Sequence, residues 1–186
     1  MIKDIFSFFF ELVKIIVISL VIIIPVRYFL IQPFYVKGAS MEPNFYDHEY
    51  LIIDEITYRF RDPERGEIIV FRYPRNPQEY FIKRIIGLPG EKIAFRDGGI
   101  YIFSGAHPDG YRLAEDNYLA EGVMTYSLTE EPITIGENEY FVLGDNRNSS
   151  KDSRSFGAVN RSFVTGRVLL RGWPLSRLEY FEAFSY

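Results

Sequence analysis

The sequence predicts a mostly β domain that a single N-terminal helix anchors in a membrane. Three observations support this fold class. An apolar run near the N-terminus is long enough to cross a bilayer, and short β-branched and aromatic segments separated by turn residues follow it. The third is length, because 186 residues suffice for one sizeable domain with an appendage. We therefore expect a tail and anchor at residues 1–33 and an antiparallel sheet or barrel-type domain at residues 34–186.

The transmembrane helix is predicted over residues 12–31. Roughly 20 residues cross the hydrocarbon core, and Lys14 and Arg27 can extend toward the two interfaces. A cleaved secretory signal is the alternative, but its cleavage site requires small residues at alternate positions, which residues 37–39 do not provide. We expect one uncleaved span. Before the span, Lys3 and Lys14 are offset by Asp4 and Glu11, while Arg27 and Lys37 follow it, so the positive-inside rule alone does not decide its orientation.

Seven strands are predicted in the remainder of the chain, where apolar and aromatic residues alternate with polar ones. They lie at residues 50–53, 66–73, 80–86, 92–95, 100–103, 139–143 and 166–170. The sequence Asp97-Gly98-Gly99 between two of them indicates a hairpin. Residues 104–136 are less periodic and richer in Gly, Pro and acidic residues, so we expect an excursion from the main sheet.

Composition excludes several function classes. The net charge is −4 and the 21 Lys and Arg residues are dispersed, so no basic face indicates a nucleic-acid partner. The absence of cysteine excludes disulfides, thiolate zinc sites and a cysteine nucleophile. Only two histidines, His48 and His107, are present. We therefore expect neither a metal nor another cofactor.

Ser40 is the first candidate for chemistry, because it lies in the segment that joins the anchor to the β-rich part. Gly38 allows other backbone to approach closely, and Pro43 disfavours helix at the residue before it. These features predict an exposed hydroxyl on a fixed turn. Serine is a weak nucleophile until a neighbouring base takes its proton. An ordinary turn serine is the simpler interpretation unless such a base exists.

Lys83 is the candidate base. Strand alternation at residues 80–86 places it on one face with Phe81 and Ile85, which is an apolar setting for an amine. Lowering the lysine pKa from near 10.4 to about 7 to 8, where it can act as a general base, requires about 4 kcal/mol. Burial can supply this free energy. The alternative is an edge lysine that discourages strand pairing.

Residues 144–154 form a third segment, which is dense in hydrogen-bonding side chains and follows a predicted strand. Asp152 and Arg154 can form an ion pair that pins this loop, and Ser150 can orient a nearby amine. A calcium loop does not fit, because Arg147 and Ser150 occupy positions that require an oxygen ligand and glycine. A solvated polar turn is the alternative interpretation.

Together the three segments resemble the bacterial type I signal peptidases. The matching residues are Ser40-Met41-x-Pro43, Tyr80-Phe81-Ile82-Lys83-Arg84 with Gly87-Leu88-Pro89-Gly90, and Gly144-Asp145-Asn146-Arg147 with Ser150 and Asp152-Ser153-Arg154. Their order and spacing match as well. The resemblance extends from the anchor to about residue 167, apart from residues 104–136, which vary in this family.

The resemblance implies a signal-peptidase-like catalytic domain with a Ser-Lys dyad, in which Ser40 is the nucleophile and Lys83 the general base. In that family the position of Ser150 helps orient the lysine, and those of Asp152 and Arg154 support the site as a salt bridge. The family lines shallow pockets for small substrate side chains at positions occupied here by Phe34, Val36, Met41, Phe81 and Ile82.

The resemblance also implies a place of action and a set of partners. Such an enzyme removes signal peptides from exported preproteins at the outer side of the bacterial cytoplasmic membrane. Its expected partners are these signal peptides, the lipid bilayer and the protein-export translocon, and not nucleic acid. A single span with the catalytic domain on the extracytoplasmic side is the expected topology.

Two positions depart from the family pattern. Many members have a hydroxyl residue two positions before the nucleophile that helps bind the oxyanion, whereas this chain has Gly38. The oxyanion hole is then expected to use the Ser40 backbone N–H and that of Gly38. At Asn148 the family often has Asp, a change expected to affect the loop more than the chemistry.

Other functions fit the sequence less well. A self-cleaving regulator of the related Ser-Lys type would be soluble, which the anchor argues against. A Ser-His-Asp hydrolase would need His48 or His107, and no Gly-x-Ser-x-Gly motif is present. A membrane-tethered β domain that only binds a partner is the non-enzymatic alternative, and it leaves Lys83 on an apolar face unexplained.

Overall fold

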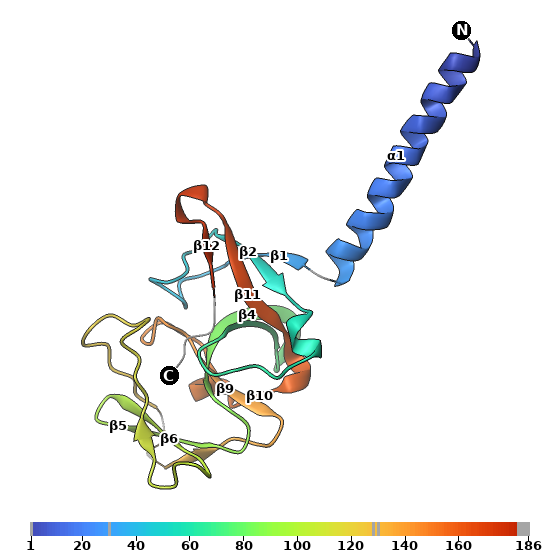
Figure 1. The fold of residues 1–186 in the computed structure, drawn as a ribbon. Helices are drawn as coiled ribbons and strands as arrows, with labels where there is room; N and C mark the ends of the chain where they lie inside the picture. Colours follow the sequence, from blue (N-terminus) through green and yellow to red (C-terminus); the bar gives the residue numbers. More distant parts are fainter. Residues whose placement is uncertain (1, 30, 128, 130, 182–186) are drawn as a thin grey trace.

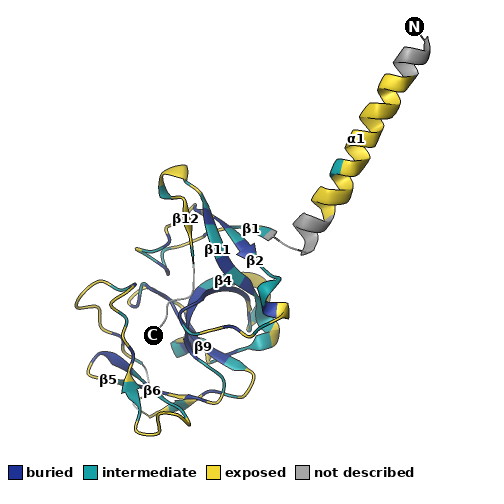
Figure 2. Ribbon diagram, viewed as in Figure 1, coloured by how far each residue is buried: buried dark blue, intermediate teal, exposed yellow. Residues whose placement is uncertain are grey.

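The computed structural model describes residues 2–29, 31–127, 129 and 131–181. Helix α1 (Ile2–Phe29) projects as a rod from a β-rich domain, as Figure 1 shows. Its segment Ser7–Ile24 has a mean hydropathy of 2.6 and none of it is buried within the protein. Figure 2 colours nearly all of its described residues as exposed. Among the residues that the structure describes, this helix is long and apolar enough to span a bilayer.

The apolar segment Ser7–Ile24 overlaps the span predicted at residues 12–31. The predicted C-terminal limit differs, because the helix ends at Phe29 and Ile31 already begins strand β1. Ile31 pairs with Asp54 of the next strand, and a residue bound into a sheet cannot continue a helix. The presence of the N-terminal helix was predicted correctly, but its predicted C-terminal limit at residue 31 was not.

Eight strands form the main sheet. They are β1 (Ile31–Tyr35), β2 (Tyr50–Asp54), β3 (Ile68–Tyr73), β4 (Asn76–Gly87), β9 (Glu139–Leu143), β10 (Val159–Asn160), β11 (Val164–Trp173) and β12 (Glu179–Tyr180). The order is β1-β2-β11-β3-β4-β9-β10, with β12 also paired to β11. Every pairing is antiparallel, which confirms the predicted fold class.

Four strands form a second, smaller sheet. They are β5 (Lys92–Arg96), β6 (Gly99–Phe103), β7 (Tyr111–Arg112) and β8 (Ile133–Thr134), in the order β7-β6-β5-β8. Asp97 and Gly98 join β5 to β6 with φ angles of 50° and 71°, as a two-residue hairpin turn requires. The predicted hairpin is confirmed. Residues 104–136 lie off the main sheet and supply the two short outer strands of this one.

Helices in the β-rich domain are short. They are α2 (Ser153–Phe156) and the 3₁₀ turns η1 (Thr57–Arg59), η2 (Arg161–Phe163) and η3 (Leu175–Arg177). Asp152 precedes α2, and its carboxylate accepts a hydrogen bond from the Arg154 N–H. This cap fixes the end of the loop that follows β9.

Strand β4 runs through the centre of the domain and contributes to different apolar clusters from its two faces. Ile85 packs with Ile69 and Phe71 of β3. Ile86, the next residue, packs with Ile93 of β5 and the other apolar residues of the small sheet. Because side chains alternate across a strand, the two polar residues just before them, at positions 83 and 84, also point to opposite faces.

Candidate active site

Ser40 and Lys83 meet at the surface between β1 and β4. Ser40 lies half-buried in the turn after β1, and Lys83 lies in β4. The Lys83 Nζ donates hydrogen bonds of 2.7 Å to the Ser40 Oγ and 2.7 Å to the Ile82 carbonyl. The structure therefore brings together the two side chains that the sequence selected, although 43 positions separate them.

The surroundings of Lys83 favour its neutral amine. The residue is only 3% exposed, and its Nζ lies 5.4 Å from the centre of the Phe81 ring. Burial lowers the Lys83 pKa from 10.5 to about 8, while the negative charges of Asp152 and Asp145 act in the opposite direction. About one tenth of the amine is therefore unprotonated at pH 7, and this neutral form can accept a proton.

The two carboxylates whose charges raise the Lys83 pKa, those of Asp145 and Asp152, each form a salt bridge with an arginine. Asp145 accepts hydrogen bonds of 2.8 and 2.7 Å from Arg84, and Asp152 accepts bonds of 2.9 and 2.8 Å from Arg154. Both pairs are bidentate, which is the strong geometry for these groups. The arginines partly neutralise the negative charge that would otherwise hold Lys83 protonated.

The loop after β9 holds the backbone of the Ser40 turn. The Asn146 N–H donates to the Ser40 carbonyl over 3.1 Å, and its side-chain amide donates to the Ala39 carbonyl over 3.0 Å. Gly144 permits this approach, because a Cβ there would collide with the Ser40 carbonyl and the Ser150 Oγ. The loop and the nucleophile turn are thus one packed unit.

Ser150 lies beside this unit. Its Oγ is buried and, within the described ranges, has no hydrogen-bond partner. A buried hydroxyl without a partner is uncommon in folded proteins. Its expected role in orienting Lys83 is not formed as a hydrogen bond in this structure and stays a prediction.

A cleft of about 600 Å³ opens next to Ser40 and Lys83. Four of the five residues expected to contact substrate line it: Phe34, Val36, Phe81 and Ile82. Met41 is not among the lining residues, because it is 1% exposed and packs with Val36 in the apolar cluster beneath the Ser40 turn. The cleft also has polar lining residues that the sequence did not single out, including Gln78, Glu79 and Lys151.

Comparison with known proteins agrees with this geometry. The family model described as signal peptidase, peptidase S26, matches residues 9–173. The chain is 39% identical over 173 residues to a probable signal peptidase I-2 of Synechocystis sp., covering 90% of this chain and 75% of that protein. The chain belongs to the signal peptidase family, peptidase S26. Its activity is therefore the cleavage of signal peptides as a serine peptidase of the signal peptidase I type.

Other relatives of this peptidase extend the comparison. A signal peptidase I of Leptolyngbya laminosa is 37% identical over 175 residues, covering 90% of this chain and 81% of that one. A crystal structure of a signal peptidase I from Enterococcus faecalis V583 is 36% identical and covers 58% of this chain and 97% of that chain, with a TM-score of 0.46. The non-enzymatic alternative of a tethered binding domain is set aside by the family assignment.

Gly38 adopts a backbone conformation that favours glycine, with a φ angle of +87°. Its N–H donates to the Asp47 Oδ1 over 3.0 Å. For this N–H to bind an oxyanion in the peptidase, the Asp47 carboxylate would first have to release it. The proposed second donor therefore stays a prediction, and Asp47 is a residue that the sequence did not select.

The remaining candidates for chemistry lie apart from the dyad. His48 is exposed and forms a 3.0 Å contact with Asp47, and His107 is exposed in the small-sheet region. Within the described residues, no group of three or more His, Asp or Glu side chains is arranged as a metal site. The residues missed by sequence analysis are Asn146 and the Arg84–Asp145 pair, although Gly144-Asp145-Asn146-Arg147 belonged to a recognised motif.

Proposed function

We propose that this signal peptidase uses Ser40 as its nucleophile and Lys83 as its general base. The observation that carries the proposal is the 2.7 Å contact between the Lys83 Nζ and the Ser40 Oγ. Because Lys83 is buried and its pKa is about 8, the amine can lose its own proton and then accept that of the serine hydroxyl.

The chemistry follows from this contact. The Ser40 Oγ attacks the scissile carbonyl as its proton passes to the Lys83 Nζ, and a tetrahedral oxyanion forms. Its collapse breaks the peptide bond, and the Lys83 ammonium protonates the leaving amine, which gives an acyl-enzyme. Lys83 then takes a proton from water as the water oxygen attacks the acyl carbonyl, and a second tetrahedral oxyanion forms. Its collapse breaks the ester bond to the Ser40 Oγ, which takes the proton back from the Lys83 ammonium, so the acid product leaves and the dyad is restored. The Ser40 N–H is the first donor in the oxyanion hole.

The cleft supports a preference for small side chains before the cut. Phe34, Val36, Phe81 and Ile82 line part of it and form an apolar surface suited to small apolar side chains. Strand β1 is at the edge of the main sheet, so an extended substrate can add to it as a further strand. We propose that the cleavable segment lies between β1 and the first half of β4.

The helix supports placement of the dyad next to a membrane. Helix α1 ends at Phe29 and β1 begins at Ile31, so the Ser40 turn follows the apolar segment closely along the chain. We propose that α1 is a single-pass anchor in the bacterial cytoplasmic membrane, with the β-rich domain on the extracytoplasmic side. Signal peptides emerging from the translocon then reach the cleft from the bilayer.

The dyad is tested by cleavage of a preprotein in detergent or lipid. Ser40→Ala should lower turnover about 10⁴-fold or more. Lys83→Ala and Lys83→Arg should each lower turnover about 10²- to 10⁴-fold, because both remove the general base. Arg cannot replace it, since guanidinium stays protonated and cannot accept the serine proton. Thermal unfolding of each variant shows whether it folds. Appreciable turnover by folded Lys83→Arg would contradict the assignment of the base.

The orientation is tested separately with thiol labelling, since the chain has no cysteine. Asp109→Cys places a thiol at an exposed position of the β-rich domain, and Lys3→Cys places one before the apolar segment. A membrane-impermeant maleimide added to intact cells should label the first variant and leave the second unlabelled. The reverse pattern would overturn the proposed topology.

A further inference from the structure

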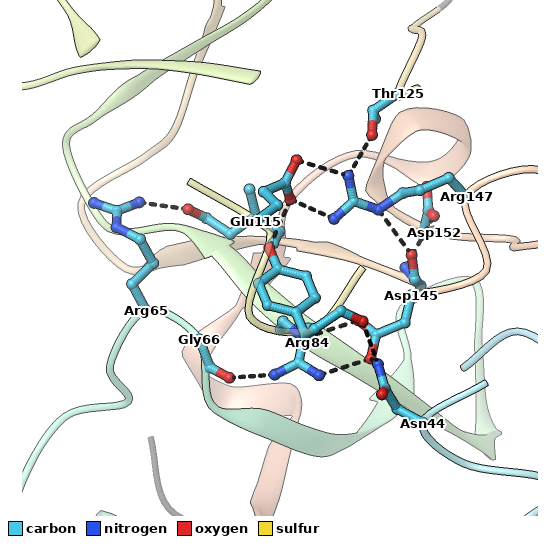
Figure 3. A network of polar contacts seen from close by, with 12 residues as sticks. Asn44, Arg65, Gly66, Arg84, Glu115, Thr125, Asp145, Arg147 and Asp152 are labelled. Atoms are coloured by element: carbon cyan, nitrogen blue, oxygen red, sulfur yellow. Dashed lines mark hydrogen bonds and ion pairs between the residues drawn. The ribbon is translucent and has the colours of Figure 1, made fainter. Parts of the chain in front are cut away.

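The side chain of Arg147, in the loop after β9, is fully buried. The carboxylate that balances its positive charge belongs to Glu115, in the segment at residues 104–136. Its guanidinium donates to both carboxylate oxygens of Glu115, over 2.5 and 3.1 Å. It also donates to the Thr125 hydroxyl and, over 3.1 Å, to the Gly144 carbonyl. Figure 3 shows Glu115 and Thr125 reaching the same guanidinium. Two of its three partners thus come from the segment whose role the sequence left open.

Glu115 is itself held in place. The Tyr118 hydroxyl donates to Glu115 over 2.6 Å, and the Tyr118 ring packs against the Arg84 guanidinium at 4.1 Å. Residues 113–125, which contain Glu115, are attached to the small sheet at both ends. The Leu113 N–H donates a hydrogen bond to the Ile100 carbonyl, and the Thr125 N–H donates one to the Gly98 carbonyl, each over 2.8 Å. Glu115 is therefore presented by a fixed element.

The contacts continue from Arg147 to both members of the dyad. Asp145 and Asn146, the residues just before Arg147, contact Arg84 and the Ser40 backbone, respectively. Arg84 is the neighbour of Lys83 in β4. The Asn44 side chain joins the same network by donating to Asp145 over 2.7 Å and to the Tyr118 carbonyl over 2.8 Å. A shift of the loop would therefore move the Ser40 turn relative to β4.

Loss of the Glu115 charge would leave a buried cation without its counter-ion. Burial by itself lowers the pKa of the Arg147 guanidinium, but the hydrogen bonds and charge of Glu115 more than offset this effect. Arginine cannot discharge in a protein, so without Glu115 the guanidinium would have to move toward water. Its bond to the Gly144 carbonyl means that the loop would move with it.

We propose that Glu115 is a positioning residue of the peptidase, which holds the loop at residues 144–147 through Arg147 and so sets the geometry between Ser40 and Lys83. The inference rests on the proposed dyad. It assigns to residues 104–136 the role of keeping Ser40 and Lys83 in position. None of these residues lines the cleft beside the dyad in the part of the chain that is described. The effect should therefore fall on turnover rather than on substrate binding.

The test compares Glu115→Gln with Glu121→Gln, a matched change at an exposed position of the same segment. In cleavage of one preprotein, Glu115→Gln should lower kcat about 10²-fold, because a small displacement of the reacting groups has an effect of this size. KM should be nearly unchanged, and Glu121→Gln should match the wild type. Glu115→Asp keeps the charge and should recover part of kcat. Acylation of Ser40 by a serine-reactive probe should slow in parallel.

A double variant tests whether Glu115 acts through Arg147. Glu115→Gln combined with Arg147→Met should turn over no more slowly than Arg147→Met alone, because both changes break the same contact. Additive losses would overturn the inference. So would a Glu115→Gln enzyme that melts at a lower temperature but keeps wild-type kcat per folded molecule. Ser40→Ala in the same assay tests the proposed nucleophile by itself. If Ser40→Ala loses turnover while Glu115→Gln does not, the dyad stands and only the role of Glu115 fails.

Discussion

The two faces of β4 hold buried basic side chains at consecutive positions, and the two differ in their counter-ions. Arg84 is 1% exposed and makes two hydrogen bonds to Asp145 and one of 2.9 Å to the Gly66 carbonyl. Lys83 is 3% exposed and contacts a hydroxyl, a carbonyl and an aromatic ring. Within the described residues Lys83 forms no ion pair, whereas Arg84 does.

This difference shows how one strand can supply both a structural cation and a base. A buried cation with a bidentate carboxylate partner stays charged and holds two segments together. A buried amine without such a partner is stabilised in its neutral form. The choice of residue agrees with the surroundings, because lysine can lose its proton when buried and arginine cannot.

The largest effect that would test this comparison is expected from Lys83→Met. Turnover should fall about 10²- to 10⁴-fold, the usual contribution of a general base. The free energy of unfolding should nevertheless rise at pH 7, because the difference between a pKa of 10.5 and about 8 corresponds to roughly 3 kcal/mol of unfavourable burial. Chemical denaturation measures the stability. A clearly less stable variant would show that Lys83 also has a structural role.

Arg84→Met should have the opposite effect on stability. It leaves the buried Asp145 carboxylate without its main partner, and loss of one member of such a pair costs about 3 to 5 kcal/mol. Chemical denaturation of both variants at one pH provides the comparison. If Lys83→Met and Arg84→Met both change the free energy of unfolding by the same small amount, the distinction between the two faces is refuted. The double variant Arg84→Met with Asp145→Leu should recover much of the loss, because no buried charge remains unpaired.

The pH dependence of stability sharpens the comparison at Lys83. Between about pH 8 and 10.5 the unfolded chain binds more protons at this lysine than the folded one, so wild-type stability should increase with pH through that window. Below about pH 8 the full cost of burying the charge is present. The stability difference between the wild type and Lys83→Met should therefore shrink as pH rises. A difference independent of pH would contradict the lowered pKa.

Turnover should follow the same ionisation. The unprotonated amine is the base, so kcat/KM should rise with pH and level off above about pH 8. The same measurement on Glu121→Gln serves as a control for a distant change of charge, and its profile should coincide with that of the wild type. An activity that falls as Lys83 deprotonates would exclude the general-base mechanism.

The smallest expected effect is that of Asp152→Asn. The Asp152 charge raises the Lys83 pKa, so its removal should lower that pKa and move the rise of kcat/KM to lower pH. The displacement should be less than about one pH unit, because Arg154 already screens this carboxylate. A displacement to higher pH would show that Asp152 acts on Lys83 through the loop rather than through its charge.

Much of the site was predictable because its signals are local. The alternation of Phe81, Lys83 and Ile85 in one strand pattern predicted a buried lysine, and burial is confirmed. Strand limits were predicted within a few residues where the pattern was regular, as for β9. They were less accurate for β4 and β11, whose register shifts extend the pairing beyond the regular pattern.

The counter-ions were not predictable, because each depends on residues far apart in the chain. Arg84 and Asp145 are 61 positions apart, and Arg147 and Glu115 are 32 apart. Many acidic residues could have paired with either arginine. The contact of Asp47 with the Gly38 N–H was missed for a related reason, since only the folded turn brings that carboxylate to the backbone.

The sequence by itself determined the membrane helix, the β-rich class of the domain, and the serine and lysine that meet at its surface, because hydrophobic periodicity and short motifs encode these features locally. Only the tertiary structure decided which buried cation has a carboxylate partner and which does not. That outcome depends on distances between side chains of different strands and loops. The same distances fix the protonation of Lys83, since the free energy of a buried charge depends on its nearest neighbours.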